Sequence, residues 1–427
     1  MLTRDVPFTV DRLRSRVLVG DGKTGKAHVL HCSYYNNYLL RTVWKDAAGF
    51  VDSERLLIGA AAEQAYFQLK GLFETHAIAD CGERKAFASR FYAWQGFGLL
   101  DFGPIQADGG VSRSTSQHYA EGWKEQFGLS SEPIGFMTRG WLAGAAAAIF
   151  DLPHGHFSTY QLECAAVTDG TDSVFELRPG GPNYDLFEGN GVGPISGAIA
   201  RMDAPTGNID AMAVADAVAT LPLFGSEDID GGLIKSFDVL ISWHPHQYYD
   251  RISMECVRQA IAKFGDEGRE AVEPLLEEAG HRCAFRTFGG IWRSAEWEAA
   301  VEPMCSTRED WIFGMVAISN CAGWGRIECL RLSEEEAVFE VHDDYESVGC
   351  LNLYGSTEFP PIYLLKGGFR GMMNLVYNEN IMDKPSLTED LYNRMCRRED
   401  AYQTCVETSI AMGDPVSVFR VTRKAAR

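Results

Sequence analysis

The pattern of apolar and polar residues predicts a pair of strands near the start of the chain. The segment 16–19 (RVLV) is strand-like, and the segment 27–35 (AHVLHCSYY) alternates with a period of two, which is typical of a β-strand. Between them, Gly20–Ala27 (GDGKTGKA) resembles a phosphate-binding loop. That loop needs a Ser or Thr where Ala27 stands and a helix after it, so the sequence favours a Gly-rich β-hairpin.

Helices are predicted further along the chain. The segments Arg55–Phe73 and Tyr248–Phe264 are interpreted as helices, and Trp141–Phe150 is an apolar helix too short to span a bilayer. Short strands are expected after the segments 95–98 (QGFG) and 322–325 (AGWG), with closing strands that end at Phe175 and Phe419.

The chain also resembles itself at a nearly constant offset. Gln95–Gly98 matches Ala322–Gly325 at an offset of 227 residues, and Tyr119 matches Tyr345 at an offset of 226. Further matches follow for Pro133–Gly140 with Pro361–Gly368, Cys164–Leu177 with Ser409–Val421, and His31–Tyr38 with His244–Asp250. Because self-similarity at a fixed period is typical of repeated units, we predict two copies of one domain.

The predicted fold class is α+β, with two tandem copies of a helix plus small antiparallel sheet domain, packed as a pseudo-dimer. The first domain, with its N-terminal hairpin, is expected at residues 1–182, and the second at 236–427. The stretch 183–235 is rich in Gly, Pro, Asp and Asn, which is typical of a connection between domains.

Net charge, apolar runs and cysteine spacing limit the classes of partner and the cellular location that the sequence favours. The 427 residues hold 39 Lys and Arg against 59 Asp and Glu, a net charge of −20, which disfavours nucleic acid and anionic membranes as partners. No apolar run is long enough for a secretory signal or a membrane span, so a cytoplasmic location is expected. None of the 11 cysteines forms a CxxC pair, which favours reduced thiols over a disulfide framework.

Three features together resemble the vinyl-4-reductase domain family. They are the Tyr-Glu pair, a glycine-centred helix start after an apolar strand, and the closing segment 411–419 (AMGDPVSVF). The resemblance is best over 91–177 and 318–421. The family includes the sensor domain of aromatic-responsive activators, and its fold is related to vesicle-tethering subunits. The resemblance implies a small enclosed hydrophobic pocket and dimerisation. A homo-oligomer is therefore one of the expected partners of the chain.

The family's zinc site is predicted to be lost, and any other cofactor is unknown. Family members often hold zinc with a Cys before the glycine helix and a Glu and two Cys near the closing strand. The matching positions here are Gly135, Gln161, Cys164 and Ser173 in the first copy, and Tyr363, Val406, Ser409 and Ser417 in the second. One thiol does not supply the four ligands of tetrahedral zinc. A shift of one residue adds Glu163 or Glu407, but no thiolate.

His118 and Glu121 are the candidate acid–base pair. Residues three apart share a helix face, and a His with a carboxylate can transfer protons near neutral pH. Tyr119 or Arg139 would then hold an oxyanion or a carboxylate. The alternative is that His118 is a helix-terminal ring stacked on Trp123 or Tyr119.

His154 and His156 are a candidate metal pair, because residues two apart on a strand face the same side. The alternative is that both are surface turn residues. A nucleophilic pair of His31 and Cys32 is disfavoured, since adjacent strand residues point to opposite faces. Both residues could nevertheless line a pocket.

Six aromatic residues in the matched regions are candidate ligand contacts: Tyr92, Trp94, Phe97, Trp123, Trp324 and Tyr345. Aromatic rings with a few polar groups suit a planar guest. The alternative is that most of these rings form the core of each domain.

Three functions remain open from the sequence. The first is binding of a small hydrophobic, aromatic molecule in an enclosed pocket of one or both copies. The second is a stand-alone enzyme of aromatic-compound or cofactor metabolism that uses His118 and Glu121. The third is an interaction scaffold, which would require an exposed apolar patch.

Overall fold

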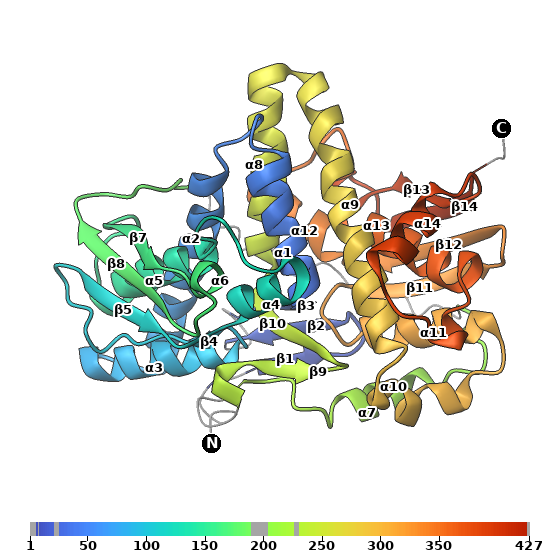
Figure 1. Ribbon diagram of the computed structural model, residues 1–427, viewed down its shortest axis with the longest axis horizontal. Coiled ribbons are helices and arrows are strands. Elements are labelled where there is room, and N and C mark those ends of the chain that lie inside the picture. Colours follow the sequence, from blue (N-terminus) through green and yellow to red (C-terminus); the bar gives the residue numbers. More distant parts are fainter. Residues whose placement is uncertain (1–5, 7, 21–24, 189–203, 226–229, 425–427) are drawn as a thin grey trace.

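The computed structural model describes residues 6, 8–20, 25–188, 204–225 and 230–424 (Figure 1). The fold is mixed α+β and holds several small antiparallel sheets, as the sequence predicted at that level. Within the described residues, no helix is both long enough and apolar enough to cross a membrane.

A five-stranded antiparallel sheet lies at the centre of the molecule. Its order is β1 (Phe8–Asp11), β2 (Arg16–Val19), β3 (Lys26–Cys32), β10 (Val239–Pro245) and β9 (Ile234–Ser236). Strands β2 and β3 pair with Val17 opposite His28, which confirms the expected hairpin; residues 21–24 between them lie outside the described part. Strand β3 also pairs with β10, with Cys32 opposite Ile241, so the sheet joins the two halves of the chain.

Each of the two central strands runs directly into a helix. Strand β3 leads into α1 (Ser33–Arg41), which continues as a π-helical segment at Thr42–Asp46, and β10 leads into α8 (His246–Phe264). Helix α9 (Asp266–Ile291) follows α8 after Gly265, whose φ of +67° is readily adopted by glycine. Helices α8 and α9 project together from the rest of the molecule (Figure 1).

The remaining elements of the first half lie on one side of the central sheet (Figure 1). They are α2 (Ser53–Thr75), α3 (Cys81–Trp94), α4 (His118–Phe127), α5 (Phe136–Ile149), α6 (Ala165–Thr168), β4 (Gly98–Leu99), β6 (Ser116–Gln117) and a sheet of β5 (Gly110–Ser114), β8 (Ser173–Pro179) and β7 (Phe157–Glu163). Strand β4 is the one expected after QGFG, and the closing strand β8 continues past Phe175.

The remaining elements of the second half lie on the opposite side (Figure 1). They are α10 (Ala295–Ala300), α11 (Arg308–Ser319), α12 (Tyr345–Tyr354), α13 (Leu364–Met373), α14 (Glu389–Arg397) and a sheet ordered β11 (Arg326–Leu332), β12 (Glu336–His342), β14 (Ser417–Arg423) and β13 (Tyr402–Thr408). Helix α7 (Ala211–Val218), from the segment between the halves, packs against α11.

Glycines allow the main helix pair of each half to pack closely. A methyl group on Gly144 of α5 would lie 2.1 Å from the carbonyl oxygen of Ala62 in α2. In the second half, a methyl group on Gly367 of α13 would lie 2.2 Å from the carbonyl oxygen of Glu277 in α9. Both helix pairs therefore make backbone-to-backbone contacts that exclude any larger residue.

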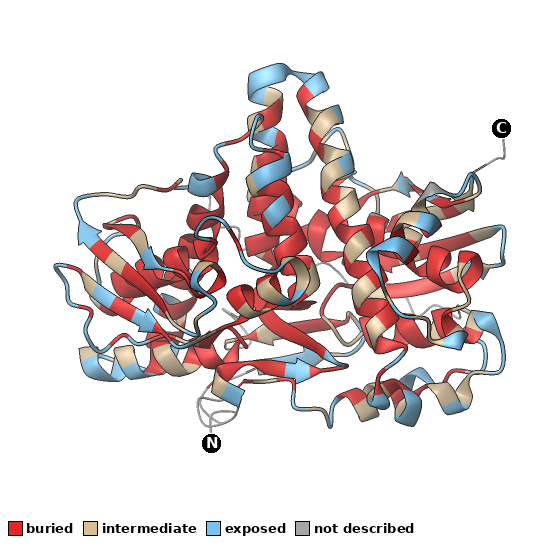
Figure 2. Cartoon of the chain, viewed as in Figure 1, coloured by how far each residue is buried: buried red, intermediate tan, exposed pale blue. Residues whose placement is uncertain are grey.

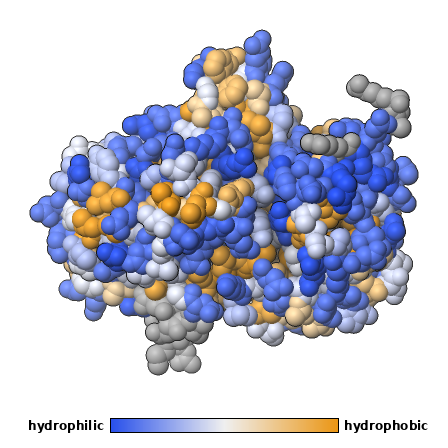
Figure 3. Space-filling model, viewed as in Figure 1, coloured by the Kyte–Doolittle hydropathy of each residue, from blue (hydrophilic) through white to orange (hydrophobic). Residues whose placement is uncertain are grey.

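The hydrophobic core lies where the helices pack against one another and against the central sheet. Figure 2 shows buried residues where the helices meet the central sheet and exposed residues on the outer edges and the tip of the α8–α9 pair. The face seen in Figure 3 is largely hydrophilic, with separate hydrophobic patches and further hydrophobic residues along its middle. This surface agrees with the strongly acidic composition.

The close approach of α2 and α5 predicts that Gly144→Ala destabilises the protein. The added methyl group meets the Ala62 carbonyl oxygen at 2.1 Å, and such overpacking costs about 1–3 kcal/mol. The matched control is Gly71→Ala on α2, where nothing lies within 4 Å and helix propensity adds up to about 1 kcal/mol. Urea unfolding of the two variants should give midpoints on opposite sides of the wild-type value; a Gly144→Ala midpoint at or above wild type contradicts the packing.

Candidate functional site

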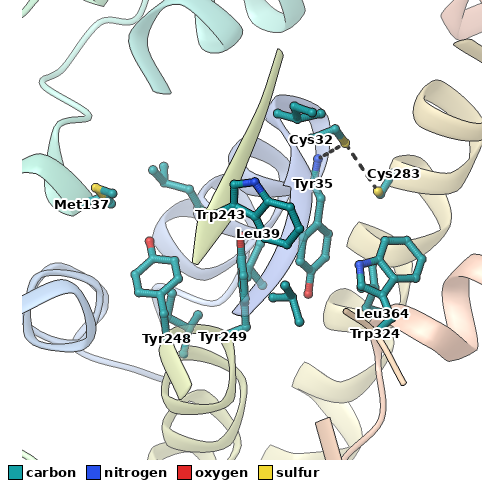
Figure 4. Close-up of a cluster of buried hydrophobic side chains, with 14 of the residues drawn as sticks. Cys32, Tyr35, Leu39, Met137, Trp243, Tyr248, Tyr249, Cys283, Trp324 and Leu364 are labelled. Carbon is teal, nitrogen blue, oxygen red and sulfur yellow. Dashed lines mark hydrogen bonds between the residues drawn. The ribbon is translucent and has the colours of Figure 1, made fainter. Parts of the chain in front are cut away.

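Two buried histidines lie near the C-terminal ends of the two central strands. His31 is on β3 and His244 is on β10, and each precedes the helix that its strand leads into. Both side chains are almost fully buried. Because the strands are antiparallel neighbours, the two histidines belong to one aromatic cluster, whose Tyr248, Tyr249 and Trp324 are drawn in Figure 4.

His31 is held by aromatic rings alone. Its ring stacks on Trp324 at a centroid distance of 5.3 Å and contacts Tyr35 at 4.6 Å and Tyr249 at 4.5 Å. Neither ring nitrogen has a hydrogen-bond partner among the described residues. Burial lowers the pKa of His31 well below its usual value, so the imidazole is neutral at pH 7 and offers one N–H donor and one acceptor nitrogen.

His31 lines a cavity of about 60 Å³. The wall comes from β3, from the residues before and within β10, from α9, from α11 with the loop after it, and from Val218 and Leu223 near α7. The wall is mostly apolar, and Trp324 and Phe288 supply its aromatic surface. An apolar wall with a few polar atoms is the usual chemistry of a small-molecule pocket.

A larger groove lies beside this cavity. It has a volume of about 880 Å³ and is bounded by the β1–β2 hairpin, α7 and the end of α11. Val218, Leu223 and Cys321 line both the groove and the cavity. The groove and the cavity are therefore adjacent, with these side chains between them.

His244 differs from His31 in that both of its ring nitrogens are bonded within the protein. Its Nδ1 lies 3.2 Å from Oε1 of Gln64, and its Nε2 lies 3.2 Å from the hydroxyl of Tyr119. The ring stacks on Tyr248 at 4.5 Å and contacts Phe97 at the same distance. The protein itself thus satisfies the polar atoms of His244, whereas those of His31 have no hydrogen-bond partner in the described part of the chain.

The two members of the predicted acid–base pair lie on one helix, α4, in different surroundings. His118 lies in a buried network, with its Nε2 2.9 Å from Nδ2 of Asn36 and 3.4 Å from Oγ of Ser242. Burial lowers its pKa to about 3. Glu121 instead lines a polar groove with Lys124, and within the described residues no hydrogen bond joins it to His118.

The two predicted anion-holding residues also have protein partners. The Tyr119 hydroxyl lies between His244 and Tyr248, at 3.2 and 3.3 Å. Arg139 donates to Oε1 of Glu54 at 2.6 Å and to the carbonyl oxygen of Thr159 at 2.9 Å. Arg139 therefore lies in an ion pair with Glu54 near the start of α5.

Of the six predicted ligand contacts, Trp324 lines the His31 cavity, Tyr345 contacts His31 at a centroid distance of 5.8 Å, and Phe97 contacts His244. The other three pack against other aromatic rings: Tyr92 against Trp141, Trp94 against Phe224 and Trp123 against Phe127. His31 and Cys32, which were expected to line a pocket, do so.

The residues at the family's zinc positions are engaged in hydrogen bonds. Gly135 donates its N–H to Oε1 of Gln161 at 2.9 Å, and Ala165 donates its N–H to Oγ of Ser173 at 2.9 Å. With Cys164 as the single thiol, this set does not fit zinc. No group of three or more His, Cys, Asp or Glu side chains that could hold a metal occurs within the described part of the chain.

The two histidines of the predicted metal pair contact different aromatic rings. His154 stacks on Tyr66 at a centroid distance of 5.1 Å, whereas His156 contacts Phe157 edge-on at 4.7 Å. Burial lowers the pKa of His154 to about 4, so its ring is neutral at pH 7. The pair stays a prediction that would need further ligands from outside the protein.

A Cys–His–Asn arrangement in the second half has the wrong tautomer for nucleophilic catalysis. Sγ of Cys396 lies 3.8 Å from Nδ1 of His281, and Nδ2 of Asn374 lies 3.2 Å from Nε2 of that ring. The Asn374 oxygen accepts the N–H of Tyr402, so its amide nitrogen must donate to Nε2. Nδ1 therefore carries the hydrogen and cannot take the proton of Cys396.

Sequence reasoning missed the far wall of the cavity. Cys283, Thr287 and Phe288 of α9 and Met315 of α11 all line it, and no motif marks them. They reach the cavity because two helices from the second half pack against a strand from the first. These residues could have been found from the sequence only if the pairing of β3 with β10 had been known.

The buried neutral imidazoles predict a pH-dependent stability. His118 has a pKa of about 3 when folded and about 6.5 when unfolded, so below pH 6.5 the unfolded chain binds a proton that the folded chain does not. Stability contributed by this group is therefore lost as pH falls. Between pH 7 and 5.5, His118→Gln should lose about 1 kcal/mol less free energy of unfolding than wild type. His76→Gln, which removes an exposed imidazole, is the control; equal losses in all three proteins contradict the burial of a neutral His118.

Comparison with solved structures finds distant likenesses, one of which is to a sensory domain. No protein-family model matches the chain, and no curated protein matches it. The crystal structure of the phenol-responsive sensory domain of the transcription activator PoxR with phenol matches 50% of this chain and 89% of that domain, at 10% sequence identity and a TM-score of 0.37. At this score the likeness identifies neither the fold nor a ligand of this chain.

Proposed function

We propose that the chain binds a small, uncharged, aromatic molecule with one hydroxyl group in the His31 cavity, which must widen from its volume of about 60 Å³ to admit a benzene ring. One observation carries the proposal: a buried, neutral imidazole with no hydrogen-bond partner among the described residues lines an apolar cavity. A buried polar group without a partner costs free energy. A ligand hydroxyl that donates to or accepts from His31 removes that cost.

The wall of the cavity favours an aromatic and neutral guest. Trp324 and Phe288 offer ring surfaces, and aromatic pairs gain about 0.5–1.5 kcal/mol beyond the area that they bury. The lining residues include no Lys, Arg, Asp or Glu. A charged guest would therefore lose its hydration without gaining an ion pair.

Equivalent hydrogen bonds in the two halves support the further proposal that the chain is a tandem repeat. Leu30 donates its N–H to the carbonyl of Ala322, as Trp243 does to that of Gln95, both at 2.8 Å. In each strand the donor is the residue directly before the histidine, Leu30 before His31 and Trp243 before His244. Each strand therefore inserts its histidine beside the GFG or GWG segment of the opposite half.

The closing hairpins of the two halves agree as well. Strands β7 and β8 shift register between Gln161 and Glu163, and β13 and β14 shift between Val406 and Thr408. Beyond each shift, a backbone N–H donates to a serine hydroxyl, from Ala165 to Ser173 and from Ile410 to Ser417. These matches favour domains at 1–182 and 236–427, joined by 183–235 and packed as a pseudo-dimer.

If the chain is a tandem repeat, the match of Tyr345 with Tyr119 shifts by one residue. The N–H of His118 bonds to the carbonyl of Phe97, and the N–H of Tyr345 bonds to that of Trp324. Both residues begin a helix, α4 and α12. His118 rather than Tyr119 is therefore the counterpart of Tyr345, one residue from the match made by sequence.

Binding of phenol to the reduced chain tests the proposed function. Isothermal titration should show that phenol binds more tightly than benzene by about 1 kcal/mol, the net value of one hydrogen bond. Benzoate should not bind, because its charge has no partner in the wall. His31→Leu should remove the preference for phenol over benzene while benzene affinity changes little.

A second variant guards against a folding defect in His31→Leu. Ala322 is only partly buried and lines the cavity, so Ala322→Leu should weaken phenol and benzene alike by filling space. Gly71→Ala, on α2 and outside the cavity lining, is the control that should bind both as wild type does. A wild-type chain that binds neither compound, or a phenol preference that survives His31→Leu, overturns the proposal.

The enzymatic alternative rests on His118, whose Nδ1 has no partner among the described residues. If His118 and Glu121 act as acid and base, the purified chain should convert an aromatic substrate without added cofactor. His118→Gln and Glu121→Gln should each lower kcat by about 10²–10⁴-fold. Turnover that persists in both variants excludes this pair, and loss in His118→Gln alone leaves Glu121 outside the chemistry.

A further inference from the structure

We propose that Cys32 and Cys283 are a redox-responsive thiol pair whose oxidation to a disulfide closes the ligand cavity. The proposal deepens the proposed function and rests on it for the ligand, although the thiol chemistry stands by itself. It is carried by the contact of two cysteines from opposite halves of the chain in the wall of one cavity.

The two sulfur atoms are already in contact. Sγ of Cys32 lies 3.8 Å from Sγ of Cys283 (Figure 4), and the two residues are 251 positions apart in sequence. Both side chains are buried. A disulfide has an S–S distance of about 2.0 Å, so the sulfurs must approach by less than 2 Å, which side-chain rotation and a small helix shift can supply.

Cys32 is placed to be the attacking thiol. It precedes α1, and its Sγ accepts the N–H of Tyr35 at 3.3 Å and bonds with the hydroxyl of Thr287 at 2.6 Å. Burial raises its pKa, but the hydrogen bonds from Cys283, Thr287 and Tyr35 outweigh burial and leave the pKa below its usual value. Burial instead raises the pKa of Cys283, which suits the resolving thiol.

Both thiols can be reached from the cavity that they line. The cavity shares Val218, Leu223 and Cys321 with the larger groove, so an uncharged oxidant of the size of water needs only small movements of these side chains to enter from the groove. Hydrogen peroxide belongs to this class. A bound aromatic ligand would fill the same space and block the approach.

The chemistry balances with peroxide as the oxidant. The Cys32 thiolate attacks one peroxide oxygen and breaks the O–O bond; the leaving hydroxide takes the proton released by the thiol and becomes water. The Cys283 sulfur then attacks the sulfur of the Cys32 sulfenic acid and forms the S–S bond. The second hydroxide leaves with the Cys283 proton as water. Two thiols lose two electrons and two hydrogens, and one peroxide becomes two waters.

The disulfide would change the cavity because it ties the start of α1 to α9 across the wall. The sulfurs move toward each other, and the Cys32–Thr287 contact is broken or displaced. By linkage, a modification that weakens ligand binding is itself disfavoured by the ligand. Oxidation and occupancy of the cavity should therefore oppose each other.

Peptide mapping of the full chain tests the thiol pair without any ligand. After hydrogen peroxide treatment and blocking of free thiols, a Cys32–Cys283 linked peptide should form and disappear with dithiothreitol. Cys283→Ser should stop at a Cys32 sulfenic acid that dimedone traps. Cys81→Ser, at a partly exposed cysteine outside the cavity, should oxidise as wild type does. Absence of the linked peptide, or preferential linkage of other cysteines, overturns the proposal.

Phenol then tests the link to the cavity. At ten times its Kd, phenol should slow formation of the linked peptide about tenfold, because about one chain in eleven remains free. The oxidised chain should bind phenol at least about fivefold more weakly than the reduced chain. If the linked peptide forms but the reduced chain does not bind phenol, the proposed function fails and the thiol pair stands. If phenol binds and gives no protection, the control of the cavity by the disulfide fails.

Discussion

The antiparallel pairing of β3 with β10 is the contact on which the rest of the structure depends. It joins a strand from the start of the chain to one that lies more than 200 residues later, with Cys32 opposite Ile241. Because each strand leads directly into a helix, this one register sets the positions of α1 and α8. It also places His31 against Trp324 of the second half and His244 against Phe97 of the first half.

The two histidines show how similar frames acquire different chemistry. Gln64 and Tyr119 satisfy both nitrogens of His244, so that ring acts as a structural polar group. His31 instead packs against aromatic rings and borders the cavity. Burial keeps both rings neutral, and the available hydrogen bonds rather than the pKa values therefore distinguish a binding residue from a structural one.

The sequence predicted local features well and the site only in part. The strand-like segments RVLV and AHVL predicted the β2–β3 hairpin, and the helical segments at 55–73 and 248–264 lie within α2 and α8. Trp324 and Tyr345, two of the predicted ligand contacts, both lie against His31. The contribution of Cys283 and Thr287 could not be predicted, because their approach to Cys32 depends on a tertiary contact across 251 and 255 residues that no local pattern encodes.

The central claim is that His31 offers a free, neutral imidazole to a small aromatic hydroxyl compound. Histidine side-chain ¹⁵N NMR during a phenol titration tests this claim most directly, with the His31 signals assigned from their absence in His31→Leu. The account predicts that the His31 nitrogens stay neutral and shift on addition of phenol, while those of His244 and His118 change little. A His31 ring that does not respond, or a response confined to His118 or His244, would contradict it.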